Sequence, residues 1–358
     1  MILPGDGIGP EITRAMRTAL EALDARFGLG LDLAQRDIGL AALEAGGTTL
    51  PADVVEQAGA ADGVILGPVS TYDYPPPEDG GRNPSAEIRK GLDLYANIRP
   101  SRGRAGVPAL APDMDLVVVR ENTEGFYADR NMFSGPGEFR PTDDTALAVR
   151  KITAGASRRI AEVAFALARR RRNSVTVVHK ANVLKVSDGL FLDEVRKSAQ
   201  GYPDVALDEV LVDAMAAMLV RQPGTYDVVL TTNMYGDILS DEASELAGGL
   251  GLAASVNVGD GHAVAQAVHG SAPDIAGRGI ANPAALMLST GMLLEWLGAR
   301  RDADELTAAA KHLAGAVDAV LADPANHTPD LGGSATTQQF TDAVAAAIGL
   351  TATGAPPP

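Results

Sequence analysis

The amino-acid sequence predicts an α/β fold with a largely parallel sheet. Short, apolar, β-branched stretches recur along the chain, as expected for buried parallel strands. Between them lie longer segments with apolar residues at helical spacing, and several of these end at glycine. With 358 residues, the chain is long enough for two lobes or for one large α/β unit.

The first helix is the best-marked element. Pro10 suits a first helical position, and an apolar stripe then runs from Ile12 to Phe27 before Gly28 ends the helix. The elements expected after it are a strand at 31–34, a helix at 52–60, a strand at 64–66, a helix at 85–92, a strand at 116–119, a helix at 156–168, and strands at 175–178 and 228–231.

Three segments interrupt this alternation. Residues 72–81 form a polar loop rich in proline and glycine, a candidate lid over a site. Residues 126–142 form a second irregular insertion, which we expect to be an arm. We expect the tail, residues 351–358, to be disordered.

Composition excludes several classes of protein. A net charge of −16 argues against nucleic-acid binding. No apolar run approaches the length of a membrane span, and the start lacks the features of a signal peptide, so we expect a cytoplasmic protein. The absence of cysteine excludes disulfides and thiolate zinc sites. The only basic run, residues 169–172, is placed to complement a helix dipole.

Asp237 and Asp241 lie four residues apart, at the start of a helix that follows the strand at 228–231 and ends at Gly248. They would share one face of the helix at the carboxyl end of a parallel strand, where ligands bind in open α/β sheets. A hard divalent cation would relieve their mutual repulsion. The alternative from this segment alone is an acidic first turn that complements the helix dipole.

Basic and hydroxyl side chains follow other strands. Arg89, Arg99 and Arg120 suggest a pocket for carboxylates, although ordinary surface ion pairing is the better explanation of their spacing alone. Tyr127 and Lys180 both lie just beyond strands, where an acid and a base could face one substrate, but each could also be structural.

Two segments rich in small residues could hold a nucleotide. The turn at residues 5–11 joins a strand to a helix, yet its glycine spacing is not the dinucleotide-binding fingerprint. The segment 269–283 contains Asp274, which could accept hydrogen bonds from a ribose diol. A plain tight turn and a plain loop are the alternatives.

Together these motifs resemble the β-decarboxylating dehydrogenases, the family of isocitrate, homoisocitrate, 3-isopropylmalate and tartrate/D-malate dehydrogenases. The resemblance spans nearly the whole chain. It rests on GDGIGPE at 5–11, LDLYANIRP at 92–100, RENTEGFY at 120–127, HKANVLK at 179–185, LVDAMAAMLV at 211–220, TTNMYGDILSD at 231–241, HGSAPDIAGRGIANP at 269–283 and TPDLGG at 328–333.

The resemblance implies a two-lobed fold, distinct from the usual Rossmann domain. The large cofactor-binding lobe would comprise residues 1–97 and 250–358. The small lobe, residues 98–249, would carry the metal ligands and the interface of a homodimer. The reaction implied is the NAD-linked, Mg²⁺- or Mn²⁺-dependent oxidative decarboxylation of a 3-substituted (R)-malate.

The resemblance also assigns roles to individual residues. The acid–base pair would be Tyr127 and Lys180, with Lys180 reaching across the dimer. The metal ligands would be Asp237, Asp241 and the neighbouring subunit's copy of Asp213. The substrate would be held by Arg89, Arg99, Arg120, Ser85 and Asn182. The nicotinamide would lie beside Ser70 and Thr71, and the adenosine half would be held by His269, Gly270, Ser271, Ala272, Asp274, Ile275 and Asn282, with Asp274 favouring NAD over NADP.

Two departures from the family pattern bear on specificity. Gln266 occupies a position where family members commonly carry an acid, which affects the contacts expected on the nicotinamide side. Residues 83–88 lack the paired leucines of isopropylmalate enzymes and the serine–asparagine order of isocitrate enzymes. The polar tyrosine loop favours a polar or acidic C3 substituent, with 3-isopropylmalate as the main alternative. A remote alternative is that the chain is a non-catalytic regulatory subunit.

Overall fold

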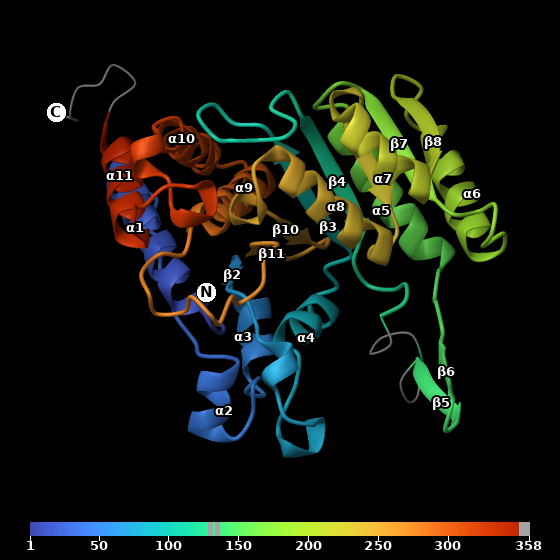
Figure 1. Ribbon diagram of the computed structural model, residues 1–358, viewed down its shortest axis with the longest axis horizontal. Coiled ribbons are helices and arrows are strands. Elements are labelled where there is room, and N and C mark those ends of the chain that lie inside the picture. Colours follow the sequence, from blue (N-terminus) through green and yellow to red (C-terminus); the bar gives the residue numbers. More distant parts are fainter. Residues whose placement is uncertain (128–131, 133–136, 351–358) are drawn as a thin grey trace.

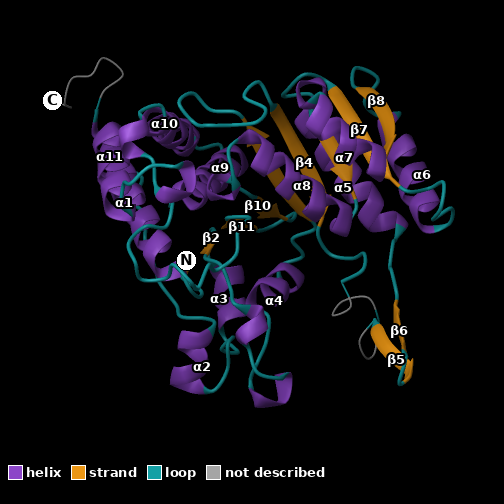
Figure 2. Ribbon diagram, in the orientation of Figure 1, coloured by secondary structure: helices purple, strands orange, loops and turns teal. Residues whose placement is uncertain are grey.

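One nine-stranded sheet runs through the molecule (Figure 1 and Figure 2). The computed structural model describes residues 1–127, 132 and 137–350. The strand order is β1-β2-β11-β10-β3-β4-β9-β7-β8. The strands are β1 (Ile2–Leu3), β2 (Val64–Leu66), β3 (Ala96–Arg102), β4 (Asp115–Glu121), β7 (Ser174–His179), β8 (Ala206–Leu211), β9 (Val228–Thr231), β10 (Val256–Val258) and β11 (Ala263–Gln266).

Helices cover both faces of this sheet. The α-helices are α1 (Gly9–Phe27), α2 (Leu40–Gly46), α3 (Val54–Ala60), α4 (Pro84–Gly91), α5 (Ala154–Ala168), α6 (Ser187–Ala199), α7 (Val212–Arg221), α8 (Asn233–Ala247), α9 (Ala284–Arg301), α10 (Asp304–Leu321) and α11 (Thr337–Gly349). Short 3-10 helices lie at Thr71–Asp73, Pro77–Asp79, Pro223–Thr225, Leu250–Leu252, Pro324–Asn326 and Pro329–Leu331.

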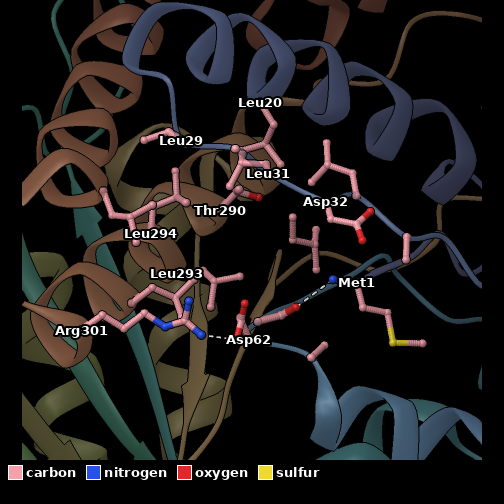
Figure 3. Close-up of a pocket in the computed structure, with 18 of the residues that line it drawn as sticks. Met1, Leu20, Leu29, Leu31, Asp32, Asp62, Thr290, Leu293, Leu294 and Arg301 are labelled. Atoms are coloured by element: carbon pink, nitrogen blue, oxygen red, sulfur yellow. Dashed lines mark hydrogen bonds and ion pairs between the residues drawn. The ribbon is translucent and has the colours of Figure 1, made fainter. Parts of the chain in front are cut away.

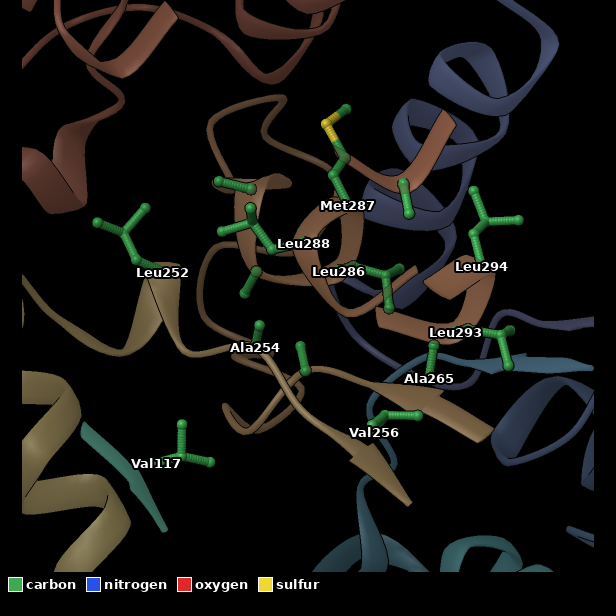
Figure 4. Close-up of a cluster of buried hydrophobic side chains, with 14 of the residues drawn as sticks. Val117, Leu252, Ala254, Val256, Ala265, Leu286, Met287, Leu288, Leu293 and Leu294 are labelled. Carbon is green, nitrogen blue, oxygen red and sulfur yellow. The ribbon is translucent and has the colours of Figure 1, made fainter. Parts of the chain in front are cut away.

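Alternation along the strands explains why both faces are buried. In β4, Val117 and Val119 belong to the largest hydrophobic cluster, which includes side chains of α1, α5, α9, α10 and α11. Leu116 and Val118 point the other way and pack with α7 and α8. Figure 4 shows the part of the largest cluster where α9 packs over β10 and β11. That cluster contains residues of both predicted lobes, 1–97 with 250–358 and 98–249. A single hydrophobic core therefore joins the two lobes.

The sheet is parallel except around β3 and β10. β10 pairs antiparallel with both β11 and β3, and β3 pairs antiparallel with β4. The other pairs, β1–β2, β11–β2, β4–β9, β7–β9 and β7–β8, are parallel. The prediction of a largely parallel sheet is confirmed, with an antiparallel segment at its centre that the sequence patterns did not indicate.

Most of the predicted elements are present, with ends shifted by a few residues. The strand predicted at 31–34 is wrong: none of these residues is in a strand, and only the next residue, Gln35, makes an isolated bridge, to Ile2. The insertion at 126–142 leads into an antiparallel hairpin of β5 (Glu138–Thr142) and β6 (Thr145–Ala148), which projects away from the sheet (Figure 1). The rest of that insertion lies partly outside the described residues, as does the tail at 351–358.

A cavity of about 670 Å³ opens beside β2, between α1 and α9 (Figure 3). Leucine is the commonest residue in its walls, and Asp32, Asp62 and Arg301 are among its polar lining residues. It shares no lining residue with the site predicted from sequence. In the described part of the chain, no helix combines the length and the apolar character needed to cross a membrane.

Candidate active site

The predicted acid, two of the arginines and two of the aspartates come together around the carboxyl ends of β4 and β9 and the neighbouring β3. Arg99 lies in β3, Arg120 near the end of β4, Tyr127 in the loop after β4, and Asp237 and Asp241 on α8. Arg99 and Arg120 are almost completely buried, at 5% and 2% exposure. The sheet order that places β3 beside β4 and β4 beside β9 creates this grouping.

Asp237 is at the centre of the group. Its Oδ1 lies 3.1 Å from Arg99 Nη1 and also pairs with Arg120 Nη1. Its Oδ2 accepts a hydrogen bond of 3.0 Å from the Tyr127 hydroxyl. Arg120 Nη2 donates to the same hydroxyl oxygen at 2.6 Å. The phenol is therefore held between a cation and an anion, which fixes its direction.

These charges determine the protonation states. Burial alone would raise the pKa of Asp237, but the positive charges of Arg120 and Arg99 outweigh it and hold this pKa below its usual value. Burial raises the pKa of Tyr127, and Arg120 opposes only part of that effect. At neutral pH the cluster therefore contains an ionised Asp237 and a protonated Tyr127, which can act as a general acid.

Asp241 lies one turn further along α8 and remains about half exposed. Burial, together with the charge of nearby Asp237, raises its pKa. Its nearest cation is Arg99, at 3.5 Å. Two carboxylates on adjacent turns provide the all-oxygen donors that Mg²⁺ and Mn²⁺ prefer, so these residues fit such an ion. Among the described residues of this single chain, however, no third acid or histidine completes a metal-binding group.

Lys180 and Asp213 form a separate pair. Lys180 Nζ donates to Asp213, and no hydrogen bond or ion pair between described residues joins either of them to Tyr127 or Asp237. The backbone N–H of Lys180 donates to buried Asp188 at 2.6 Å, and Asp188 also pairs with Arg150. This fixes the loop after β7. Asn182 lies in the same loop and is exposed.

The candidate nucleotide segments also meet. Ser70 and Ser271 share a hydrogen bond of 2.8 Å between their hydroxyls. Asp6 accepts from the backbone N–H of Ser70 at 2.9 Å, and the N–H of Ile8 donates to the carbonyl of Ser271 at 2.8 Å. A Cβ on Gly7 would lie 2.0 Å from that carbonyl, so only glycine allows this close approach.

The other predicted adenosine residues lie along the same loop. Nε2 of His269 is buried without a hydrogen-bond partner among the described residues, and burial lowers the pKa of this ring, which is therefore neutral. Asn282 donates to Asp330 at 3.0 Å. Gly270 and Asp274 are exposed, and Ala272 and Ile275 are partly buried; Thr71, predicted beside the nicotinamide in another segment, is also exposed. An unsatisfied buried nitrogen beside exposed polar groups fits the binding of a nucleotide.

Arg89 and Ser85 lie on α4. Arg89 Nη2 donates to Gln266 Oε1 at 2.8 Å, and Ser85 Oγ lies 3.3 Å from the same amide. The charge of Arg89 contributes to lowering the pKa of Asp237, so Arg89 acts on the same site. Gln266, which we expect to affect the nicotinamide side, contacts these two predicted substrate residues.

Several polar residues that support the arginines were missed by the sequence analysis. Asn233 Oδ1 accepts from Arg120 Nε at 2.9 Å. Ser240 accepts from Arg99 Nη1 at 2.7 Å, and Asn97 accepts from Arg99 Nε. Asn97 could have been found only if β3 had been predicted as a strand, because residues two apart in a strand share a face. The other two could not, since they lie more than a hundred positions from their partners.

Comparisons with known proteins agree with this geometry. Residues 1–344 match the family described as isocitrate/isopropylmalate dehydrogenase. An isocitrate/homoisocitrate dehydrogenase of Thermus thermophilus is 43% identical over 348 residues, covering 97% of each chain. The 3-isopropylmalate dehydrogenase of Methanothermobacter thermautotrophicus is 41% identical and covers 96% of each.

A solved structure gives the same result. The crystal structure of isocitrate dehydrogenase from Methylococcus capsulatus superposes with a TM-score of 0.85 at 40% identity, covering 97% of this chain and 98% of that one. The match to the family extends over nearly the whole chain, as do the matches to individual relatives. The protein therefore belongs to the isocitrate/isopropylmalate dehydrogenase family.

Proposed function

We propose that this chain catalyses the metal-dependent, NAD-linked oxidative decarboxylation of a 3-substituted (R)-malate to a 2-oxo acid and CO₂. The observation that carries this proposal is the convergence of Arg99, Arg120, Tyr127, Asp237 and Asp241 around the carboxyl ends of β4 and β9. Buried guanidinium groups bind carboxylates, adjacent acids bind a hard cation, and a protonated phenol supplies a proton.

The chain's own residues would divide the work as follows. Arg99 and Arg120 hold the malate carboxylates, and Arg89 assists from α4. Lys180 accepts the proton of the C2 hydroxyl as the hydride leaves. After CO₂ is lost, Tyr127 donates its proton to C3, and the hydrogen bond from Arg120 keeps the phenol aimed during the transfer.

The two bound groups would be held by different residues. Asp237 and Asp241, with Asp213 of a second subunit, would hold Mg²⁺ or Mn²⁺. Ser70, Thr71 and the loop from His269 to Asn282 would hold NAD. When bound, the metal would polarise the oxygen on C2 and NAD would accept the hydride. Asp274 is exposed on that loop, where a carboxylate disfavours the 2′-phosphate of NADP.

We further propose a homodimer with shared active sites. Two observations support it. Val220 on α7 and Ile238 on α8 are largely exposed apolar side chains, and every residue of the β5–β6 hairpin is exposed. An isolated two-stranded hairpin is marginally stable in water, so a partner surface is expected. Sharing also explains why Lys180 and Asp213 lie apart from Tyr127 within one chain.

Each subunit would have two lobes, one formed by residues 1–97 with 250–358 and the other by residues 98–249. We also propose that the enzyme is cytoplasmic. Relatives named for isocitrate/homoisocitrate and for 3-isopropylmalate both match well, so the C3 substituent needs a direct test. A polar or acidic substituent is our first choice, 3-isopropylmalate the main alternative, and tartrate/D-malate a further one.

The test is NADH formation from a panel of 3-substituted malates with Mg²⁺ or Mn²⁺. We expect turnover that a chelator abolishes and that Tyr127→Phe reduces at least about a hundredfold, as for loss of a general acid. A folded wild-type protein that turns over no member of the panel would refute the proposal. It would favour a regulatory subunit instead.

A further inference from the structure

Gln266 joins the two predicted substrate residues of α4 to the sheet. It is the last residue of β11 and is 8% exposed. Its Oε1 accepts from Arg89 Nη2 at 2.8 Å and lies 3.5 Å from the amide nitrogen of buried Asn257. Ser85 Oγ lies 3.3 Å from both the oxygen and the nitrogen of the same amide. The Gln266 side chain therefore contacts Ser85 and Arg89 at once.

The direction of this amide is fixed. Two donors, Arg89 and Asn257, point at Oε1, which leaves Nε2 to donate to Ser85 Oγ. The backbone of Gln266 is also held, because its N–H donates to the carbonyl of Ser255 and its carbonyl accepts from the Ser255 hydroxyl at 2.6 Å. A serine hydroxyl that accepts from Nε2 keeps its own proton for a ligand.

We propose that Gln266 is a specificity-determining residue that makes Ser85 and Arg89 a pair of donors for an anionic substituent at C3 of the substrate. The proposal rests on the proposed function and names the substrate class of that site: malates whose C3 substituent ends in a carboxylate. Gln266 itself is a positioning residue, because it acts through Ser85 and Arg89.

A carboxylate at position 266 would reverse both effects. It would pair with Arg89 as an ion, reducing the positive charge that a substrate meets. It also has no N–H to offer, so the Ser85 hydroxyl would donate to it and turn its lone pairs toward the ligand. Both changes disfavour an anionic substituent, and neither penalises an apolar one to the same degree.

The charge of Arg89 reaches the rest of the site, since it opposes the rise in the pKa of Tyr127 and helps to lower the pKa of Asp237. Neutralising it would weaken the binding of every malate to some extent. The diagnostic quantity is therefore the ratio of affinities for two substrates that differ only at C3, and not the affinity for one of them.

The decisive variant is Gln266→Glu. Its control, Gln200→Glu, makes the same charge change at the exposed end of α6. Dissociation constants of a carboxyalkyl-substituted and an alkyl-substituted malate are measured by calorimetry with Mg²⁺, and NADH formation is recorded separately. We expect the wild type and the control to prefer the carboxyalkyl compound, and Gln266→Glu to lower that preference by about tenfold or more, through KM rather than kcat.

Ser85→Ala provides a second variant if Gln266→Glu does not fold, and it should lose the same preference. The inference is overturned if folded Gln266→Glu weakens both ligands equally, if the wild type prefers the alkyl compound, or if Ser85→Ala keeps the full preference. Binding with the expected ratio but without NADH formation would refute the proposed reaction and leave the assignment of Gln266 standing.

Discussion

Asp237 and Asp241 should differ in what they contribute to the metal-free protein. Asp237 neutralises two buried arginines, at 3.1 Å from Arg99 and in direct contact with Arg120. Asp241 has one cation at 3.5 Å and a raised pKa, so its charge is only weakly compensated. Asp237→Asn should therefore destabilise the protein in the presence of a chelator, whereas Asp241→Asn should be close to neutral.

The magnitude follows from burial. Removing one partner of a fully buried ion pair costs about 3–5 kcal/mol, because a charge remains buried without compensation. The Asp237 side chain is 43% exposed, so solvent screens part of the effect. We expect a loss of about 2 kcal/mol in the free energy of unfolding, or roughly 3 °C in Tm for a chain of this size.

The dependence on pH adds a second test. Because the folded-state pKa of Asp237 is lowered, its stabilisation is present above the pKa of the unfolded chain and is lost as pH falls through the folded-state value. The difference between wild type and Asp237→Asn should shrink in acid. Both variants should lose metal-dependent turnover. Urea unfolding with a chelator would refute this reasoning if Asp237→Asn were as stable as Asp241→Asn.

Three further predictions concern other parts of the molecule. Burial raises the pKa of Glu124 to about 7. The free energy of unfolding should therefore fall by up to about 3 kcal/mol as pH rises from 4.5 to 7 and the folded protein loses this proton. Urea titrations of Glu124→Gln should lack this fall. The kcat/KM for NAD⁺ should exceed that for NADP⁺ by at least about 10²-fold, and Asp274→Asn should reduce this ratio. Equal kcat/KM values for the two cofactors in the wild type would contradict the prediction. Co-refolded Tyr127→Phe and Lys180→Ala proteins, each inactive alone, should regain roughly a quarter of wild-type activity; no recovery in proven mixed dimers would place the whole site within one chain.

Features encoded over a few neighbouring residues were predicted correctly from the sequence. α1 follows its apolar stripe between Pro10 and Gly28, and Gly28 has the left-handed conformation (φ 65°) expected of a helix-ending glycine. The apolar stretches in β4 and β9 became buried strands. Asp237 and Asp241 lie on one face of α8 because helical geometry alone places residues i and i+4 together.

Features that depend on pairing were decided by the tertiary structure. Residues 31–34 have strand-like composition, yet the only bridge to β1 here is made by the next residue, Gln35, and a strand needs a continuous hydrogen-bonding partner. β3 and β10 were not predicted as strands. They are strands because they pair antiparallel with each other and because each has a second antiparallel neighbour, β4 for β3 and β11 for β10.

The contacts that organise the candidate site belong to this second group. Asp237 meets Arg99 and Arg120, Ser70 meets Ser271, and Gln266 meets Arg89, over separations of more than a hundred residues. The sequence alone specified the residue types, the helices that carry Arg89, Asp237 and Asp241, the strand that Arg120 follows, and the family pattern. The order of strands in the sheet determined which side chains meet, because hydrogen bonds and ion pairs act over a few ångströms in space regardless of separation along the chain.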